Sequence, residues 1–334
     1  MKILITGGAG FMGSNFIRYL LQTHADYSVV NLDKLTYAGN TENLADVIGE
    51  YPDRYSFIRG DIAKSEDLSQ AANGCDTIIN FAAETHVDRS IMDPASFLNT
   101  DVIGAYTILE YVRTHPVKRF IQISTDEVYG SISDAEVTED APFRPNSPYS
   151  ASKASGDLLC RAYSVTYKTP VLLTHGCNYY GPYQYPEKLI PLFITNLIEK
   201  KKIPLYGDGS NVREWIYADD FCRALDLVML KGKAGEAYNI GTGYRISNKD
   251  LTMKILSLLN APREMLQYVP DRPGHDARYA LNSDKICALG WQPHLTFDAA
   301  LKKTVDWYVR NEPWWRRLKS GEFLEYYKRQ YKTL

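Results

Sequence analysis

The residues best suited to chemistry follow an apolar run, Arg119 to Ile123, near the middle of the chain. The next segment, Ser124 to Gly130, has the sequence STDEVYG and supplies the hydroxyl of Thr125 and two adjacent carboxyls, Asp126 and Glu127. In a dry pocket, burial and mutual repulsion raise the pKa of one member of such a pair, so the two can divide acid and base work. The segment therefore predicts proton transfer to and from a bound substrate.

A tyrosine and a lysine four residues apart, Tyr149 and Lys153, follow this segment. That spacing places both side chains on one face of a helix. A free phenol, with a pKa of about 10, is a poor base near neutrality, but a nearby ammonium and a positively charged nicotinamide would both lower the pKa of Tyr149. Tyr149 could then take a proton from a sugar hydroxyl while hydride leaves the same carbon for NAD, and Thr125 could orient that alcohol.

The start of the chain predicts the dinucleotide site that this chemistry needs. Lys2 to Thr6 is expected to form a buried strand, and Ser14 to Gln22 has the apolar spacing of a helix. Glycines 7, 10 and 13 lie between them in a GxxGxxG pattern. Without Cβ atoms the backbone can turn tightly and approach a pyrophosphate at the helix N-terminus.

An acidic residue, Asp33, closes the next expected strand, Tyr27 to Leu32, about 20 residues after the glycines. A carboxylate there would hydrogen-bond the ribose diol and repel a 2′-phosphate, which favours NAD over NADP. The neighbouring cation, Lys34, could tolerate such a phosphate, but Asp33 holds the strand end and should decide the preference.

Strands and helices alternate through the first half of the chain. Further strands are expected over Tyr55 to Arg59, Cys75 to Ala83 and Arg119 to Ser124, with a long helix over Pro94 to Thr114. The alternation predicts an α/β fold with a Rossmann-type doubly wound parallel sheet. Ligands bind at the carboxyl ends of such strands, where Asp61 could meet an adenine amino group and where Ala82 and Ala83 would let the cofactor lie against the backbone.

The predicted domains are a Rossmann domain over residues 1–175, which also carries the catalytic residues, and a smaller substrate-binding α/β region. That region is expected to span residues 176–334, mainly for the sugar nucleotide, with some segments returning to the first domain.

Composition narrows the class of protein. The chain has 334 residues, of which 45% are hydrophobic and 23% charged, and a formal net charge of −2; this argues against a nucleic-acid binder or a membrane-surface protein. The five cysteines contain no CxxC and the six histidines are scattered, so neither a disulfide framework nor a metal site is expected. No signal peptide or transmembrane segment is evident, and we expect a cytoplasmic protein.

Several motifs together resemble the extended short-chain dehydrogenase/reductase family: the glycine turn, Ser124-Thr125, Tyr149-xxx-Lys153 and the NYYGP segment at 178–182. More closely, four segments resemble the dTDP-glucose 4,6-dehydratases: DKLTYAG at 33–39, AETHVDRS at 83–90, TDEVYG at 125–130 and DRPGHD at 271–276. The resemblance spans nearly the whole chain. The Thr-Asp-Glu segment is its most diagnostic part, because epimerases of the same family lack the acid pair.

The resemblance implies a reaction in three steps on dTDP-glucose. Oxidation at C4 creates a ketone that makes the C5 proton acidic, Glu127 removes that proton, and Asp126 protonates the departing C6 hydroxyl. Reduction at C6 then returns the cofactor to NAD and leaves dTDP-4-keto-6-deoxyglucose and water. A homodimer is also implied, formed through helices near 95–114 and 149–168.

Three alternatives stay open at this stage. A sugar-nucleotide 4-epimerase shares everything except the use of Asp126 and Glu127, and a 4,6-dehydratase could act on UDP-glucose instead. A non-catalytic NAD-binding protein is argued against because Tyr149, Lys153 and both acids are intact.

The expected site falls into three groups. The expected catalytic residues are Thr125, Asp126, Glu127, Tyr149 and Lys153. The expected NAD contacts are Gly7, Gly10, Phe11, Met12, Gly13, Asp33, Lys34, Thr36, Asp61, Ile62, Ala82, Ala83, Tyr149 and Lys153. The expected substrate contacts are Glu84, Thr85, His86, Thr125, Asn178, Lys188, Leu189, Tyr206, Arg213, Asn248, Arg272, His275 and Tyr279.

Two of these assignments have a structural alternative. Arg213 is assigned to the diphosphate because a guanidinium forks onto phosphate oxygens, and its alternative is a salt bridge with Glu214. His86 would reach the sugar or the nicotinamide edge, or else bond to backbone. The adjacent Asp88 and Arg89 are expected to form an internal ion pair.

The chain departs from the family pattern at a few positions. Asp101 stands where the family usually has Asn, and Tyr179 replaces a common Asn. Together with His175, Tyr179 is expected to reshape the sugar pocket.

Overall fold

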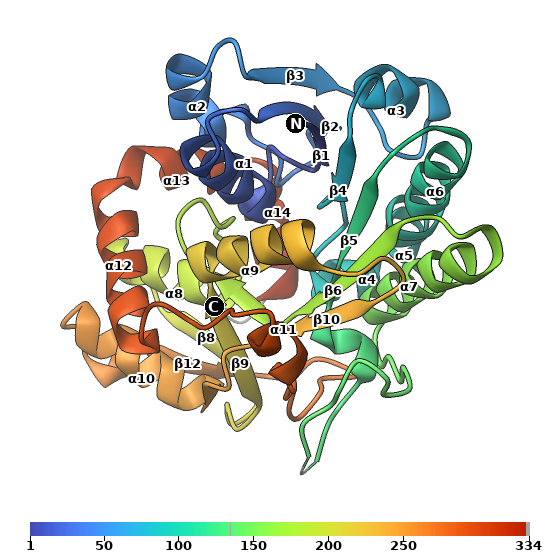
Figure 1. The fold of residues 1–334 in the computed structure, drawn as a ribbon. Helices are drawn as coiled ribbons and strands as arrows, with labels where there is room; N and C mark the ends of the chain where they lie inside the picture. The colour runs from blue at the N-terminus through green and yellow to red at the C-terminus, as the bar shows by residue number, and fades with distance from the viewer. Residues whose placement is uncertain (134, 332–334) are drawn as a thin grey trace.

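The computed structural model describes residues 1–133 and 135–331, and its centre is a seven-stranded parallel sheet (Figure 1). The strand order is β10-β6-β5-β4-β1-β2-β3. The order changes direction beside β1, so a crevice lies outside the carboxyl ends of β1 and β4. The predicted doubly wound sheet is confirmed. The strands are β1 (Lys2–Thr6), β2 (Ser28–Asp33), β3 (Tyr55–Arg59), β4 (Thr77–Asn80), β5 (Arg119–Thr125), β6 (Val171–Gly176) and β10 (Ala237–Ile240).

Helices cover both faces of this sheet (Figure 1). On one face, α1 (Phe11–Thr23) and α9 (Ala218–Lys231) bury an apolar cluster that includes Phe16 and Phe221, both fully buried. On the other face, a second cluster joins α3 (Ser65–Ala72), α6 (Ala105–Thr114) and α7 (Pro148–Tyr167) to the strands. The apolar stripes that predicted amphipathic helices are therefore the surfaces that bury the sheet.

The helix expected over Pro94 to Thr114 is continuous but not regular. It starts as α5 (Pro94–Phe97), where Asp93 caps the first turn, passes through a π-helical segment (Leu98–Gly104) and continues as α6. π-helical turns are rare and are frequent at functional sites. This one lies against α7, the helix that carries the Tyr-xxx-Lys pair.

The second region is built on two small sheets. The three-stranded sheet holds β7 (Asn178–Tyr180), β9 (Val212–Tyr217) and β11 (Arg245–Ser247), and the other pairs β8 (Ile203–Tyr206) with β12 (Leu266–Val269). An aromatic cluster that includes the fully buried Trp315 and Tyr308 joins them to the helices. Those helices are α8 (Leu189–Ile198), α10 (Asn248–Leu258), α12 (Phe297–Arg310), α13 (Glu312–Leu318) and α14 (Glu322–Gln330).

Short elements complete the chain. The α-helices are α2 (Ala45–Glu50), α4 (Val87–Met92) and α11 (Asp284–Ala288), and 3-10 turns span Thr41–Leu44, Asp126–Tyr129 and Arg263–Met265. Within the described residues, no helix combines the length and the apolar character needed to cross a membrane.

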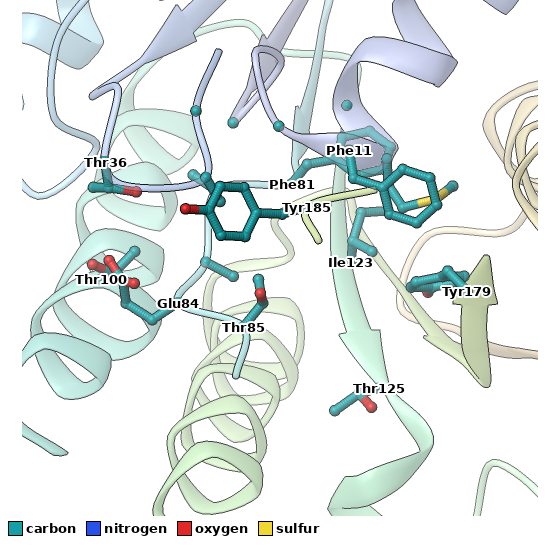
Figure 2. A pocket seen from close by; sticks show the side chains of 18 of the residues that line it. Phe11, Thr36, Phe81, Glu84, Thr85, Thr100, Ile123, Thr125, Tyr179 and Tyr185 are labelled. Atoms are coloured by element: carbon teal, nitrogen blue, oxygen red, sulfur yellow. The ribbon is translucent and has the colours of Figure 1, made fainter. Parts of the chain in front are cut away.

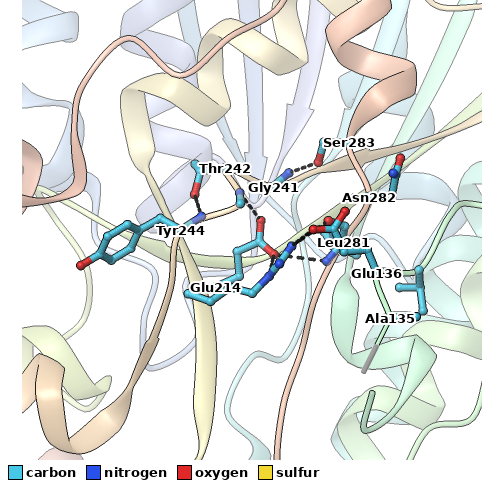
Figure 3. A network of polar contacts seen from close by, with 12 residues as sticks. Ala135, Glu136, Glu214, Gly241, Thr242, Tyr244, Leu281, Asn282 and Ser283 are labelled. Atoms are coloured by element: carbon cyan, nitrogen blue, oxygen red, sulfur yellow. Dashed lines mark hydrogen bonds and ion pairs between the residues drawn. The ribbon is translucent and has the colours of Figure 1, made fainter. Parts of the chain in front are cut away.

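A buried carboxylate ties segments of both regions together (Figure 3). Glu214 on β9 is fully buried and accepts the backbone N–H groups of Gly243, at 2.8 Å, and Leu281, at 3.2 Å. Its charged partner is Arg245, whose Nε lies 3.1 Å away. Arg245 also pairs with Glu136. The division predicted at residue 175 stays a prediction, although α9 and β10 do return to the large sheet from beyond it.

Candidate active site

The glycine turn after β1 forms one wall of a cavity at the carboxyl ends of the strands (Figure 2). A Cβ on Gly7, whose φ is +69°, would lie 2.5 Å from the backbone nitrogen of Ala82, and one on Gly13 would lie 2.4 Å from the carbonyl oxygen of Gly7. Only glycine allows this close approach. Gly10 is the N-cap of α1, and because it has no side chain it cannot cap the first amides of the helix. Those backbone N–H donors are therefore available to an anion.

The acidic residue predicted for ribose is held at the end of β2. The two carboxylate oxygens of Asp33 accept the backbone N–H groups of Ala9, at 2.9 Å, and Leu35, at 2.8 Å, and burial raises the pKa of this carboxyl. Lys34 Nζ lies 2.7 Å from Asp61 Oδ2. The cation that could have served a 2′-phosphate is therefore already paired, which favours a cofactor without that phosphate.

All fourteen residues predicted to contact NAD line this first cavity. The sequence analysis missed other lining residues. Thr100 follows from no motif, and Phe81, Ile123 and Tyr185 are apolar or aromatic side chains that sequence alone does not separate from core residues. In Figure 2, Phe11, Phe81 and Ile123 lie on one side of the cavity, whereas Glu84 and Thr100 lie together on another.

The predicted catalytic side chains converge at the end of β5. The phenol of Tyr149 forms a side-chain hydrogen bond with the hydroxyl of Thr125. The buried Lys153 donates a hydrogen bond from Nζ to the carbonyl oxygen of Ile123 at 2.8 Å. Ser147 caps α7 through a capping box with Ser150, which fixes the start of the helix that carries Tyr149 and Lys153.

The expected lowering of the Tyr149 pKa is wrong for the chain by itself. Burial, followed by the negative charges of Glu127 and Asp101, raises the pKa of this phenol well above its ordinary value. The expectation rested on the ammonium of Lys153 and on a bound nicotinamide, whereas burial and the carboxyls that the fold brings beside the ring act in the opposite direction. A cationic ligand in the cavity is therefore needed before Tyr149 can act as a base near neutrality.

The two acids of the Thr-Asp-Glu segment occupy different surroundings. Asp126 is 3% exposed, its Oδ1 accepts from Thr125 Oγ1 at 3.2 Å, and its Oδ2 has no partner among the described residues. Burial and then the charges of Glu127 and Glu214 raise its pKa well above the ordinary range. The half-buried Glu127 faces the cavity, where burial raises its pKa but nearby arginine charges oppose the rise. Asp126 is thus the better acid and Glu127 the better base.

A second cavity adjoins the first and shares seven lining residues with it: Thr85, Glu127, Asn178, Tyr179, Gln184, Glu187 and Lys188. Twelve of the thirteen residues predicted to contact substrate line these cavities, and all of them except Thr125 and Glu84 belong to the second one. They are Thr85, His86, Asn178, Lys188, Leu189, Tyr206, Arg213, Asn248, Arg272 and His275, together with Thr125 and Glu84 in the first.

One predicted substrate contact lines neither cavity. The exception is Tyr279, which is buried behind the wall. Its hydroxyl donates to Asp276 at 2.6 Å and lies 3.5 Å from Glu127 Oε2, and the guanidinium of Arg213 stacks 4.4 Å from its ring centre. Tyr279 therefore supports Glu127 and Arg213 from behind the cavity wall.

The second cavity contains polar atoms that are buried but unpaired within the described chain. Among them are Asn178 Oδ1, Asn248 Oδ1 and Arg272 Nε. A buried polar atom without a partner is costly, and each such atom in a native structure needs an explanation. Two acceptors and a cationic donor that face one cavity fit a polar, anionic ligand.

The diphosphate assignment of Arg213 keeps its support, and the alternative of a salt bridge with Glu214 is wrong. Glu214 pairs with Arg245 instead (Figure 3). Arg213 is 5% exposed and spends two donors on backbone carbonyls, those of Val212 and Asp276. The carbonyls hold the guanidinium in place while it lines the second cavity.

The expected ion pair between Asp88 and Arg89 is also wrong, because successive residues of α4 point in different directions. Asp88 faces the second cavity and pairs with Arg272 at 3.3 Å. Arg89 pairs with Glu187, at 2.9 Å, and with Glu322 on α14, at 2.8 Å. These contacts tie the C-terminal helix to the wall of the site.

The two predicted histidine roles are also resolved. His86 lines the second cavity, and burial lowers its pKa to about 4, so its ring is neutral near pH 7. His175 is 1% exposed and lines neither cavity; it lies 3.2 Å from Asp157 and 3.0 Å from the hydroxyl of Tyr129. The expectation that His175 reshapes the sugar pocket is therefore wrong, whereas Tyr179 does line both cavities.

Tyr179 fits because residue 176 is a glycine. A Cβ on Gly176 would lie 1.9 Å from the Tyr179 hydroxyl oxygen, so a larger residue there would displace the ring. The ring packs edge-on against Phe221, with 4.6 Å between ring centres. Gly176 thus leaves the space that the ring of Tyr179 occupies.

Comparison with known proteins agrees with this geometry. The family model described as GDP-mannose 4,6 dehydratase matches residues 4–304. The low-salt glycan biosynthesis protein Agl12 of Haloferax volcanii is 49% identical over 312 residues, which cover 93% of this chain and 100% of that protein. The dTDP-glucose 4,6-dehydratase of Streptomyces niveus is 48% identical, covering 96% of this chain and 97% of that protein.

Solved structures give the same result. The dTDP-glucose 4,6-dehydratase DesIV of Streptomyces venezuelae, crystallised with NAD and TYD bound, is 49% identical with a TM-score of 0.93, covering 96% of this chain and 100% of that chain. Solved sugar-nucleotide 4-epimerases share the fold at 29% identity, and are therefore more distant.

Proposed function

This chain belongs to the dTDP-glucose 4,6-dehydratase family, and from that membership we propose that it converts dTDP-glucose into dTDP-4-keto-6-deoxyglucose and water with NAD as a recycled cofactor. The observation that carries the proposal is the pair of unlike acids beside a Tyr-Lys pair. Burial and neighbouring negative charges raise the pKa of Asp126 and so favour its neutral form, whereas Glu127 lies near three cationic side chains that favour its charged form.

The residues around the first cavity fit NAD. The glycine turn leaves a cradle that a Cβ would fill, and Asp33 stands where a ribose diol needs an acceptor. Bound NAD would accept hydride from C4 of the sugar and return it to C6. The positive charge of the oxidised nicotinamide also opposes the raised pKa of Tyr149.

The roles of the side chains follow from their surroundings. Tyr149 takes the C4 hydroxyl proton, with Thr125 orienting that alcohol. Glu127 removes the C5 proton, and Asp126 gives its proton to the C6 hydroxyl, which leaves as water. Glu127 then returns a proton to C5. The proton that Tyr149 gained is released to solvent and Asp126 takes one up, so protons and atoms balance over the full cycle.

The second cavity is proposed to hold the thymidine diphosphate part of the substrate. The support is its unpaired polar atoms and two guanidiniums, those of the buried Arg213 and the half-buried Arg272, which suit a diphosphate. Tyr279 is proposed as a supporting residue and not as a nucleoside contact.

The rival function is a 4-epimerase, and the closer identity to dehydratases together with the acid pair argues against it. The purified protein should be incubated with dTDP-glucose and, separately, with UDP-glucose. We expect a 4-keto-6-deoxy product that absorbs in alkali, formed faster from dTDP-glucose. Formation of dTDP-galactose without loss of water would sink the proposal, and a preference for UDP-glucose would correct its substrate.

We also propose a homodimer formed through α6, α7 and the π-helical segment before α6. These elements carry exposed apolar side chains, among them Leu98, Tyr106, Leu158 and Val165, which are 47–60% exposed in the single chain. Apolar side chains gathered on neighbouring helices indicate a buried interface. Light scattering should give twice the chain mass for the native protein and one chain mass for Leu158→Glu, while Leu230→Glu, on α9, stays dimeric. A native monomer at micromolar concentration would contradict the proposal.

A cytoplasmic location is proposed from the cysteines. All five are free thiols and four of them are buried, which suits a reducing compartment. Cell fractionation with an antibody tests this, and recovery in a secreted or membrane fraction would contradict it.

A further inference from the structure

A buried carboxyl that the proposed reaction does not use lies behind the catalytic pair. Asp101, in the π-helical segment, is 3% exposed. Its Oδ2 accepts the hydroxyl of Ser152 at 2.7 Å, and the backbone N–H of Glu84 also favours its charged form. Its Oδ1 is buried and has no hydrogen-bond partner of good geometry among the described residues. A carboxyl so placed carries a large desolvation cost and needs a compensating reason.

That reason lies on α7. Ser152, which holds Asp101, immediately precedes Lys153, and the ammonium of Lys153 lowers the pKa of Asp101. Gly156 on the next turn lets the two helices approach, because a Cβ there would lie 2.8 Å from the carbonyl oxygen of Asp101. The backbone geometry thus places this carboxyl against the segment that carries Tyr149 and Lys153.

The charges that face Asp101 come from two elements. Lys153 and Asp157 face it from α7, and Glu84 faces it from the segment after β4. Tyr149, at the start of α7, has its pKa raised in part by Asp101. Glu84 is in turn influenced by Lys34, Arg89 and Asp93. Glu84 lines the first cavity beside Thr100, the residue before Asp101 (Figure 2).

We infer that Asp101 is a positioning residue for Tyr149 and Lys153. Its buried carboxylate offsets the ammonium of Lys153 and keeps the phenol of Tyr149 protonated. The same negative charge makes the cavity favour the positively charged, oxidised form of NAD over the reduced form. Ionisation of Tyr149 then depends on the charge that the oxidised cofactor brings. The family's usual Asn at this position would hold the same hydrogen bond without the charge.

The effect should depend on pH in a defined direction. Burial raises the pKa of Asp101 to about 6 and that of Glu84 to about 7. Asp101 is therefore charged at pH 8 and neutral at pH 5, so its preference for the oxidised cofactor should be present at pH 8 and lost at pH 5. Asp101→Asn removes the charge at both values while keeping an acceptor for Ser152.

The test measures cofactor affinity without any sugar nucleotide. NADH binding is followed by its fluorescence, and NAD⁺ binding by displacement, for the native protein, Asp101→Asn and Ser152→Ala at pH 8 and pH 5. The control for loss of a charge is Asp298→Asn on α12, where Asp298 forms an exposed ion pair with Lys254. At pH 8 we expect Asp101→Asn to weaken NAD⁺ relative to NADH by about tenfold, equivalent to about one pKa unit. At pH 5 we expect less than a twofold change, and the control should match the native protein at both.

Three results would overturn the inference: an unchanged affinity ratio for Asp101→Asn at pH 8, an equal change at both pH values, or the same change in Ser152→Ala, which keeps the carboxylate. If Asp101→Asn does not fold, as judged by circular dichroism, the native protein still tests the inference, because a preference for NAD⁺ that does not fall between pH 8 and pH 5 would overturn it. The inference rests on the proposed NAD dependence. Failure to bind either cofactor form refutes the proposed function, whereas binding with an unaffected ratio refutes only the role of Asp101.

Discussion

Replacement of Asp126 by asparagine separates the loss of water from the oxidation that precedes it. Asp126 is 3% exposed and accepts a hydrogen bond from Thr125 at 3.2 Å. Burial and the charges of Glu127 and Glu214 raise its pKa well above the ordinary range, which favours the neutral, protonated form of the native side chain. Asparagine keeps the shape, the neutrality and the acceptor, and removes only the transferable proton.

The expected loss of activity is therefore large and the expected loss of stability small. General acid catalysis contributes roughly 10²- to 10⁴-fold, which corresponds to about 2.7 to 5.4 kcal/mol of the activation barrier. The hydrogen bond from Thr125 is retained, so the free energy of unfolding should change by less than about 1 kcal/mol.

The assay follows two products in deuterium oxide. We expect Asp126→Asn to form the 4-keto-6-deoxy product at least about 100-fold more slowly than the native protein, while dTDP-glucose recovered from the reaction gains deuterium at C5, because oxidation and Glu127 are intact. Asp298→Asn serves as the control with native rates. Native rates of water loss in Asp126→Asn, or a parallel loss of water release and C5 exchange, would refute the assignment of the acid.

Three further predictions test other parts of the site. Glu127→Gln should block deuterium entry at C5 while oxidation at C4 persists, and full exchange by mass spectrometry would refute the base assignment. Gly7→Ala should weaken NAD binding by at least about tenfold in a fluorescence titration. The added methyl group would meet the Ala82 backbone at 2.5 Å, and alanine is strained at the positive φ of this position. Native affinity in this variant would show that the glycine turn does not hold the NAD pyrophosphate. Glu84 binds its proton more tightly in the folded chain, since its pKa rises from 4.5 to about 7, so it stabilises the fold below about pH 4.5 and loses that contribution as pH rises through 7. Glu84→Gln should therefore gain up to about 3 kcal/mol relative to the native protein between pH 5 and pH 8 in urea unfolding, and an equal difference at both pH values would contradict the assigned pKa.

Local patterns were enough to predict the sheet and the cofactor cavity. The strand over Lys2 to Thr6 has the predicted bounds because a buried parallel strand is a short apolar run bounded by turn residues. The edge strand over Tyr55 to Arg59 also has the predicted bounds, although it is only partly buried. The glycine turn and the acidic residue after β2 lie at fixed sequence distances from one another, so their convergence follows from the topology. The π-helical segment could not be predicted, since its insertion changes no apolar spacing that distinguishes it from a regular helix.

The long-range charge contacts could not be predicted from the sequence. The pairs of Asp88 with Arg272 and of Arg89 with Glu187 join residues about 100 to 180 positions apart, and adjacency in sequence suggested a pair that the helix direction forbids. The raised pKa of Tyr149 has the same origin, because Asp101 comes from a different helix. Burial of His175 likewise depends on the register of β6 beside β5, where it lies opposite Ser124.

The most direct test of the central claim is a single incubation of the native protein with dTDP-glucose and NAD in deuterium oxide, followed by nuclear magnetic resonance of the product. The acid pair, the Tyr-Lys pair and the recycled cofactor together predict dTDP-4-keto-6-deoxyglucose with deuterium at C5 and no net consumption of NAD. Recovery of dTDP-galactose with an intact C6 hydroxyl and no deuterium at C5 would contradict the account.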